Sequence, residues 1–117
     1  MIIDDEPIGI EVIKTLIQEL TPGLSIVGTA TNGNEALQSV STLKPDLIFL
    51  DLDMPYMNGI EVLQRLSNQS MQIIMTTGFE QKKINLASDC VCGWLTKPID
   101  PEEFLTVVNG ARKKIGV

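Results

Sequence analysis

Short apolar runs alternate with segments of helical periodicity along the whole chain. The run at 47–50 contains no polar residue, as expected for a strand that is buried on both faces of a parallel sheet. Between such runs, apolar residues recur every three or four positions, which is typical of amphipathic helices. The pattern predicts five strands, at residues 1–3, 24–29, 47–50, 73–75 and 94–96.

Helix-start and helix-stop residues follow the expected strands. Pro7 and Pro101 suit the first turn of a helix, where a missing N–H costs nothing. Asp100 precedes Pro101, and Glu103 follows three residues after Asp100, which is typical of a helix N-cap. The segment at 80–88 has little apolar surface and predicts only a weak helix. The five expected helices run from Pro7 to a stop at 21–23, from 32–34 to 44–45, onward from 58–59, over 80–88, and from 100 to 114.

Five strands, each followed by a helix, predict one α/β domain over residues 1–117. Right-handed crossovers and the number of helices favour a single doubly wound parallel sheet in the flavodoxin-like order 2-1-3-4-5, with five helices distributed over both faces. Only residues 1–3 precede Asp4, although the first strand should be interior in this order. We therefore expect either a natural start further upstream or excision from a longer protein.

Composition argues against several classes of function. The net charge of −6 lacks the basic footprint of direct nucleic-acid binding, and the absence of histidine excludes Ser-His-Asp triads and His-ligated zinc. Cys90 and Cys92 are too close for an ordinary disulfide and too few for a zinc site, so we expect reduced thiols in or near a strand. No apolar run approaches the roughly 20 residues of a transmembrane helix, and no export leader opens the chain. These features predict a cytoplasmic protein without membrane contact.

Polar residues stand where the expected strands end. In sheets of this type, ligands bind beyond the carboxyl ends of the strands, so these side chains should converge. Two carboxylates about 4 Å apart repel each other by roughly 4 kcal/mol at an effective dielectric constant of 20. An acidic cluster there indicates a hard divalent cation with oxygen ligands, Mg²⁺ first and Mn²⁺ as an alternative. The residues concerned are Asp4, Asp5, Asp51, Thr77 and Lys97.

Lys97 and Thr77 should face Asp51 from the side opposite the acidic pair. An ammonium and a hydroxyl aimed at a carboxylate indicate an incoming anion with several oxygen atoms, and a phosphoryl group matches this requirement. Because an aspartate carboxylate is a known nucleophile in phosphoryl transfer, Asp51 is the predicted acceptor. Thr76 is the neighbouring hydroxyl, but alternation along a strand places it on the opposite face from Thr77.

The full set of motifs resembles the receiver domains of bacterial two-component response regulators, which are CheY-like. The resemblance covers essentially the whole chain. Its motifs, in order, are Asp4-Asp5-Glu6-Pro7, Asp51-Leu52-Asp53-Met54-Pro55, Asn58-Gly59, Thr77-Gly78 and Lys97-Pro98.

The resemblance implies a role for each site residue. Asp51 would accept the phosphoryl group from a phosphohistidine on a sensor histidine kinase or a histidine phosphotransfer protein. The metal would be held by Asp4, Asp5 and Asp51, together with the backbone carbonyl of Asp53. Lys97 and Thr77 would bind phosphoryl oxygens, and the side chains of Thr77 and Trp94 would shift together on phosphorylation.

The resemblance also implies how the signal leaves the domain. The helix expected at 80–88, the strand at 94–96 and the helix from 100 to 114 would form the output surface for an output domain or an effector, or for a phosphorylation-dependent homodimer. No enzymatic activity is expected beyond self-directed phosphotransfer and autodephosphorylation. Asp53 and Phe79 stand at positions that tune the phosphate lifetime in this family, and the lifetime itself stays open.

Three other functions compete with this interpretation. A haloacid-dehalogenase-like phosphatase also uses an aspartate nucleophile with a second aspartate two residues on, as in Asp51 and Asp53, but Met54-Pro55 follows where that family has threonine. A nucleotide- or flavin-binding module of the same fold is weakly supported, because no glycine-rich phosphate loop is present. A degenerate receiver that binds partners without phosphorylation is the third alternative, and the complete set of site residues argues against it.

Overall fold

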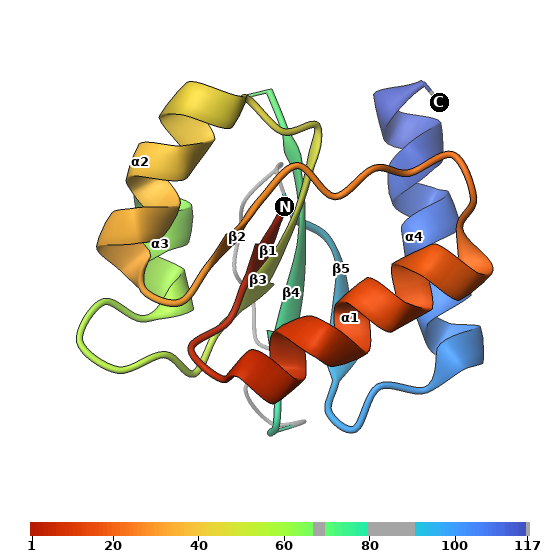
Figure 1. Ribbon diagram of the computed structural model, residues 1–117, viewed down its shortest axis with the longest axis horizontal. Coiled ribbons are helices and arrows are strands. Elements are labelled where there is room, and N and C mark those ends of the chain that lie inside the picture. The colour runs from red at the N-terminus through yellow and green to blue at the C-terminus, as the bar shows by residue number, and fades with distance from the viewer. Residues whose placement is uncertain (67–69, 80–90, 117) are drawn as a thin grey trace.

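Strands and helices alternate in the computed structural model, which describes residues 1–66, 70–79 and 91–116 (Figure 1). The helix expected at 80–88 lies outside the described residues. The described elements are β1 (Ile2–Ile3), α1 (Pro7–Leu20), β2 (Thr29–Ala30), α2 (Gly33–Leu43), β3 (Leu47–Asp51), α3 (Gly59–Leu66), β4 (Gln72–Thr77), β5 (Val91–Thr96) and α4 (Pro101–Ile115).

The strands form one parallel sheet in the order β2-β1-β3-β4-β5, which confirms the predicted fold class. Ile3 of β1 pairs with Leu50 of β3, so Asp4 and Asp51 each lie one position further toward the carboxyl edge. Thr77 at the end of β4 pairs with Thr96 at the end of β5. The register therefore brings the carboxyl ends of four strands to one edge of the sheet.

Helices cover both faces of the sheet. Figure 1 shows α1 and α4 on one side and α2 and α3 on the other. Ile13 of α1 and Phe104 of α4 are buried against the first face, where the ring of Phe104 stacks on Phe49 with centroids 5.7 Å apart. Val40 of α2 and Val62 of α3 are buried on the second face. Since each such side chain contributes about 1.5–3 kcal/mol on full burial, the two layers hold the strand ends in fixed positions.

Side-chain caps begin three of the helices that the structure describes. Asn32, Asn58 and Asp100 accept hydrogen bonds from the backbone N–H three residues further on, at 2.8, 3.0 and 3.0 Å. Each cap satisfies one of the N–H groups that the first turn of a helix leaves without a partner. The expected start of the last helix at Asp100 is thus confirmed. No helix within the described ranges is long and apolar enough to cross a membrane.

The strand expected at 24–29 is wrong over most of its length. Only Thr29 and Ala30 form β2, because the neighbouring β1 offers just two residues for pairing. The last strand was expected at 94–96 but begins at Val91, since pairing with β4 extends back to Ile73. Cys92 therefore lies within β5 and not in a turn before it. Cys90 lies outside the described residues.

Candidate functional site

Asp51 is the last residue of β3 and is only 2 % exposed. Its neighbour Leu52 donates its backbone N–H to the carbonyl of Thr76 at 2.8 Å, which carries the β3–β4 ladder to the very end of the strand. The backbone N–H of Asp53 donates to Oδ1 of Asp51 at 3.1 Å. The carboxylate of Asp51 is thereby held at the edge of the sheet by the two residues that follow it.

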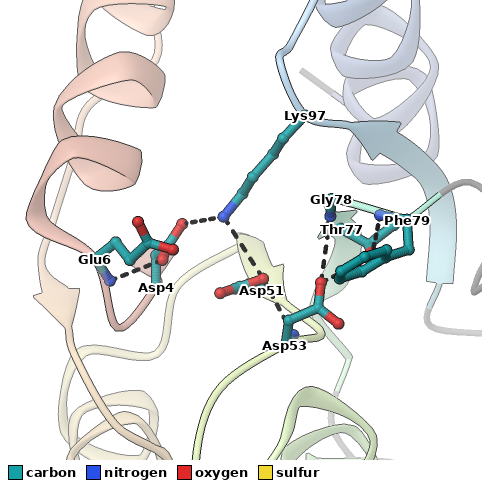
Figure 2. A network of polar contacts seen from close by, with 8 residues as sticks. All are labelled: Asp4, Glu6, Asp51, Asp53, Thr77, Gly78, Phe79 and Lys97. Carbon is teal, nitrogen blue, oxygen red and sulfur yellow. Dashed lines mark hydrogen bonds and ion pairs between the residues drawn. The ribbon is translucent and has the colours of Figure 1, made fainter.

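Two further carboxylates converge on Asp51 from the end of β1. Asp4 is buried and Asp5 is half-buried, and one carboxylate oxygen from each of these residues and from Asp51 lies within 4.8 Å of the others. The backbone N–H of Glu6 donates to Oδ1 of Asp4 at 2.9 Å and fixes that side chain (Figure 2). The expected acidic cluster is thus assembled, and its spacing and oxygen chemistry could hold a divalent cation.

Lys97 lies between the carboxylates of Asp4 and Asp51 and not, as expected, on the side of Asp51 opposite the acidic pair. Its Nζ is 2.8 Å from Oδ2 of Asp4 and 3.6 Å from Oδ1 of Asp51, as Figure 2 shows. The backbone N–H of Lys97 donates to the carbonyl of Thr77 at 2.7 Å, which seats the residue directly after β5. The peptide bond between Lys97 and Pro98 is cis. Burial alone would lower the pKa of Lys97, but the hydrogen bond and the charges of Asp4 and Asp51 raise it overall.

The environment of Asp51 disfavours its charged form in the absence of a cation. Burial away from water raises the pKa of Asp51 to about 7, and the nearby charge of Asp4 adds to the rise. The hydrogen bond from the Asp53 backbone and the charge of Lys97 act in the opposite direction. A cation bound among these carboxylates would favour the ionised form of Asp51.

Thr77 is fully buried, and its side chain reaches the loop after β3. Its Oγ1 donates to Oδ2 of Asp53 at 2.8 Å, and the backbone N–H of Gly78 donates to the same oxygen at 3.2 Å. Sequence reasoning gave Asp53 a metal contact through its backbone carbonyl and a position that tunes the phosphate lifetime, but it missed this contact of the side chain with Thr77. The position of Asp53 in the sequence could have indicated the contact, because Asp53 follows β3 at the edge where the neighbouring strand β4 ends in Thr77.

Trp94 lies on the same face of the sheet as Thr77. It pairs with Met75 in the β4–β5 register, and Thr77 pairs with Thr96, so alternation directs all four side chains to one side. Trp94 is partly buried against the core beneath α2 and α3. The structure thus places Trp94 one strand over from Thr77 and two positions further from the carboxyl edge.

Gly59 closes the loop that follows Asp51, and sequence reasoning assigned it no function beyond the Asn58-Gly59 motif. Its backbone N–H donates to the carbonyl of Leu52 at 3.1 Å. A Cβ at this position would lie 2.5 Å from the carbonyl oxygen of Asp51 and 2.7 Å from Cα of Leu52. Because both neighbours are backbone atoms, only glycine lets α3 begin this close to the acceptor.

The family model for the response regulator receiver domain matches residues 1–109. The chain is 34% identical to an uncharacterized response regulatory protein of Vibrio vulnificus over 114 residues, covering 97% of this chain and 47% of that protein. It is 33% identical over 115 residues to the nitrate/nitrite response regulator protein NarL of Escherichia coli, covering 95% and 53% respectively. The chain thus spans about half the length of the curated relatives it matches.

A solved structure agrees with this result. The chemotaxis protein CheY4 of Vibrio cholerae superposes with a TM-score of 0.77 at 29% identity, with 94% of each chain covered. This chain belongs to the response regulator receiver domain family. It is a CheY-like signal-transduction module of a two-component system, as the motifs predicted.

Proposed function

We propose that this receiver domain is a phospho-acceptor switch in which Asp51 takes a phosphoryl group with Mg²⁺ bound beside it. One observation carries the proposal. The buried carboxylate of Asp51 lies beside two further carboxylates and the ammonium of Lys97. The hydroxyl of Thr77 lies at the same edge. Repulsion among the carboxylates destabilises the protein when the site is empty, whereas a cation and an anion bound together would balance the charges.

Asp4, Asp5 and Asp51 are the residues that would hold the metal, with the backbone carbonyl of Asp53 as a further ligand. The convergence of three carboxylate oxygens within 4.8 Å supports this assignment. Hard oxygen ligands fit Mg²⁺, and Mn²⁺ is the alternative. When bound, the metal would neutralise charge on the carboxylates and on the phosphoryl oxygens.

The residues of the chain then account for the transfer step. A carboxylate oxygen of Asp51 forms a bond to phosphorus while the bond from phosphorus to the imidazole nitrogen of a phosphohistidine breaks, and that electron pair stays with the donor. The ammonium of Lys97 and the hydroxyl of Thr77 would each bind a phosphoryl oxygen and stabilise its charge. Only the ionised form of Asp51 can attack, so the neighbouring cations must offset the burial that raises its pKa.

The signal would pass from Asp51 through Thr77 to Trp94. Phosphorylation adds about −1.5 to −2 charges at pH 7, and a phosphoryl oxygen would accept a hydrogen bond from the Thr77 hydroxyl. Any movement of Thr77 alters the packing on its face of the sheet, where Trp94 also lies. The output surface would comprise the segment at 80–88, β5 and α4, and it would bias an existing equilibrium between two states.

The donor would be a sensor histidine kinase or a histidine phosphotransfer protein in the cytoplasm. The output surface would serve an output domain, an effector protein or a phosphorylation-dependent homodimer. We expect no turnover of other substrates beyond phosphotransfer to Asp51 and its hydrolysis. Steady hydrolysis of a small phosphate ester would instead favour the phosphatase alternative.

Intact-mass analysis after incubation with acetyl phosphate tests the proposal. A gain of one phosphoryl group that requires Mg²⁺ and is absent in Asp51→Asn is expected. No adduct in the wild-type protein, with Mg²⁺ shown to bind, would favour a degenerate receiver that acts without phosphorylation. Failure to bind Mg²⁺ at all would contradict the assignment of the acidic cluster.

A further inference from the structure

The Asp53 carboxylate already occupies two hydrogen-bond donors at the phosphoryl site. Its Oδ2 accepts from the Thr77 hydroxyl at 2.8 Å and from the Gly78 backbone N–H at 3.2 Å, as seen in Figure 2. We call these two hydrogen bonds the Asp53 latch. Both are charge-assisted, a class of hydrogen bond that is roughly twice as strong as its neutral counterpart.

The hydrogen of the Thr77 hydroxyl is committed to this contact. Thr77 is fully buried, so water has no access to its side chain. The backbone N–H of Phe79 donates to the oxygen of the same hydroxyl at 3.2 Å, which leaves the single hydroxyl hydrogen directed at Asp53. A second anionic oxygen can take that hydrogen only if the Asp53 carboxylate gives it up.

Asp53 is also tied directly to the acceptor. Its backbone N–H donates to Oδ1 of Asp51 at 3.1 Å. The carboxylate of Asp53, which accepts the two hydrogen bonds of the latch, is therefore linked through its own backbone to the carboxylate of Asp51, which would carry the phosphoryl group. A phosphoryl group on Asp51 would be anionic, as the side chain of Asp53 is. The oxygen atoms of both groups need hydrogen-bond donors at this edge of the sheet. Like charges so close to each other would favour departure of the Asp53 side chain.

We propose that the Asp53 carboxylate is an internal competitor of the phosphoryl group: it holds the Thr77 hydroxyl and the Gly78 N–H in the unphosphorylated state and must release them when Asp51 is phosphorylated. The inference rests on the proposed role of Asp51. It assigns the Asp53 side chain an autoinhibitory contact, distinct from the metal contact expected of its backbone carbonyl. Apparent affinity for a phosphoryl group is then reduced by the fraction of molecules in which the latch is closed.

Fluoroberyllate, a non-covalent mimic of a phosphoryl group on a carboxylate, is a suitable probe in the presence of Mg²⁺. Its bound fraction can be followed by ¹⁹F NMR in the wild-type protein, in Asp53→Ala and in Asp53→Asn. We expect about tenfold tighter binding by Asp53→Ala, which corresponds to about 1.4 kcal/mol, because this variant loses both hydrogen bonds of the latch and leaves the donors of Thr77 and Gly78 to the probe. Asp53→Asn, which keeps an acceptor for Thr77, should bind less tightly than Asp53→Ala.

A double-mutant cycle separates competition from simple charge repulsion. In the wild-type background, Thr77→Val removes the phosphoryl contact and the latch together, so affinity should fall only slightly. In the Asp53→Ala background the same change removes an uncontested contact, and affinity should fall about tenfold. Equal losses in the two backgrounds would overturn the proposal, and so would a smaller loss in the Asp53→Ala background, which would mean that Asp53 supports Thr77.

The latch can also be tested without any phosphoryl mimic. The Gly78 amide proton should resonate downfield and exchange slowly in the wild-type protein, and it should lose both features in Asp53→Ala. An unchanged Gly78 amide would overturn the latch while leaving the role of Asp51 intact. Binding of fluoroberyllate by none of the proteins would instead contradict the proposed phosphoryl site, and the latch would fall with it.

Discussion

The ammonium of Lys97 lies closer to Asp4 than to Asp51, with Nζ 2.8 Å from Oδ2 of Asp4 and 3.6 Å from Oδ1 of Asp51. The cation that should meet a phosphoryl group therefore pairs, before phosphorylation, chiefly with a residue of the expected metal site. Both carboxylates are almost fully buried, so Lys97 offsets a repulsion that water cannot screen. A metal on Asp4 would weaken this pairing and leave Lys97 available to Asp51.

Replacement of Lys97 should destabilise the metal-free protein. In Lys97→Ala two buried carboxylates lose their shared cation, and the free energy of unfolding should fall by about 3 kcal/mol in urea titrations at pH 8 with a chelator present. Mg²⁺ should recover much of this loss. Lys14→Ala removes an exposed helical pair with Glu11 and should change the stability by less than about 0.5 kcal/mol. A Lys97→Ala protein as stable as the wild type would contradict the account.

The raised pKa of Asp51 predicts a pH-dependent gain in stability on its replacement. In the unfolded chain Asp51 ionises near pH 4, whereas in the folded protein its pKa is about 7. The folded state therefore holds the proton more tightly and loses stability as the pH rises from about 4 through 7.

Asp51→Asn does not titrate, so the gain in its free energy of unfolding over the wild type should be smallest near pH 4 and reach a plateau above pH 7. Since one pKa unit corresponds to about 1.4 kcal/mol, the plateau should be on the order of a few kcal/mol with no divalent cation present. Thermal unfolding of both proteins across this range provides the measurement. A difference in Tm that does not vary between pH 4 and 8 would contradict the buried, cation-dependent state of Asp51.

Gly59→Ala should impair the site. The added Cβ would meet the Asp51 carbonyl and the Leu52 backbone at 2.5 and 2.7 Å, which forces the loop that carries Asp51 to move. We expect destabilisation by about 1–3 kcal/mol and slower phosphorylation by acetyl phosphate. Gly110→Ala is the matched control, because nothing lies within 4 Å of its Cβ, and it should gain up to about 1 kcal/mol from helix propensity. Equal behaviour of the two variants would refute the close approach at Gly59.

Trp94 is the only tryptophan and should report on the site by fluorescence. Binding of fluoroberyllate with Mg²⁺ should change its emission in the wild-type protein, because Trp94 and Thr77 share one face of the sheet. Asp51→Asn should show no change, and Thr77→Val should show a reduced one. If emission stays constant while ¹⁹F NMR demonstrates binding, Trp94 does not take part in the switch.

The convergence of the acidic residues could be predicted because it depends on topology alone. Once the runs at 47–50 and 73–75 are recognised as parallel strands, Asp51 and Thr77 must lie at one edge. The prediction of a strand at 24–29 was wrong because it rested on local composition. The composition favours a strand, but the length of β2 is set by β1, which offers only two residues for pairing.

Contacts within the loop after β3 could not be predicted. The path from Leu52 to Gly59 has no periodic pattern and depends on a close backbone approach at Gly59. The hydrogen bond between Asp53 and Thr77 follows from that path. The preference of Lys97 for Asp4 over Asp51 likewise depends on differences of under an ångström between side chains, which residue spacing does not encode.

The most direct test of the central claim is to trap the modified residue. An aspartyl phosphate is an acyl phosphate, and borohydride reduces it to the alcohol with release of phosphate, so it leaves homoserine in the chain. After incubation with acetyl phosphate and Mg²⁺, reduction and peptide mass mapping, we predict homoserine at position 51 and at no other aspartate. Homoserine at Asp4, Asp5 or Asp53 with Asp51 unmodified would contradict the account.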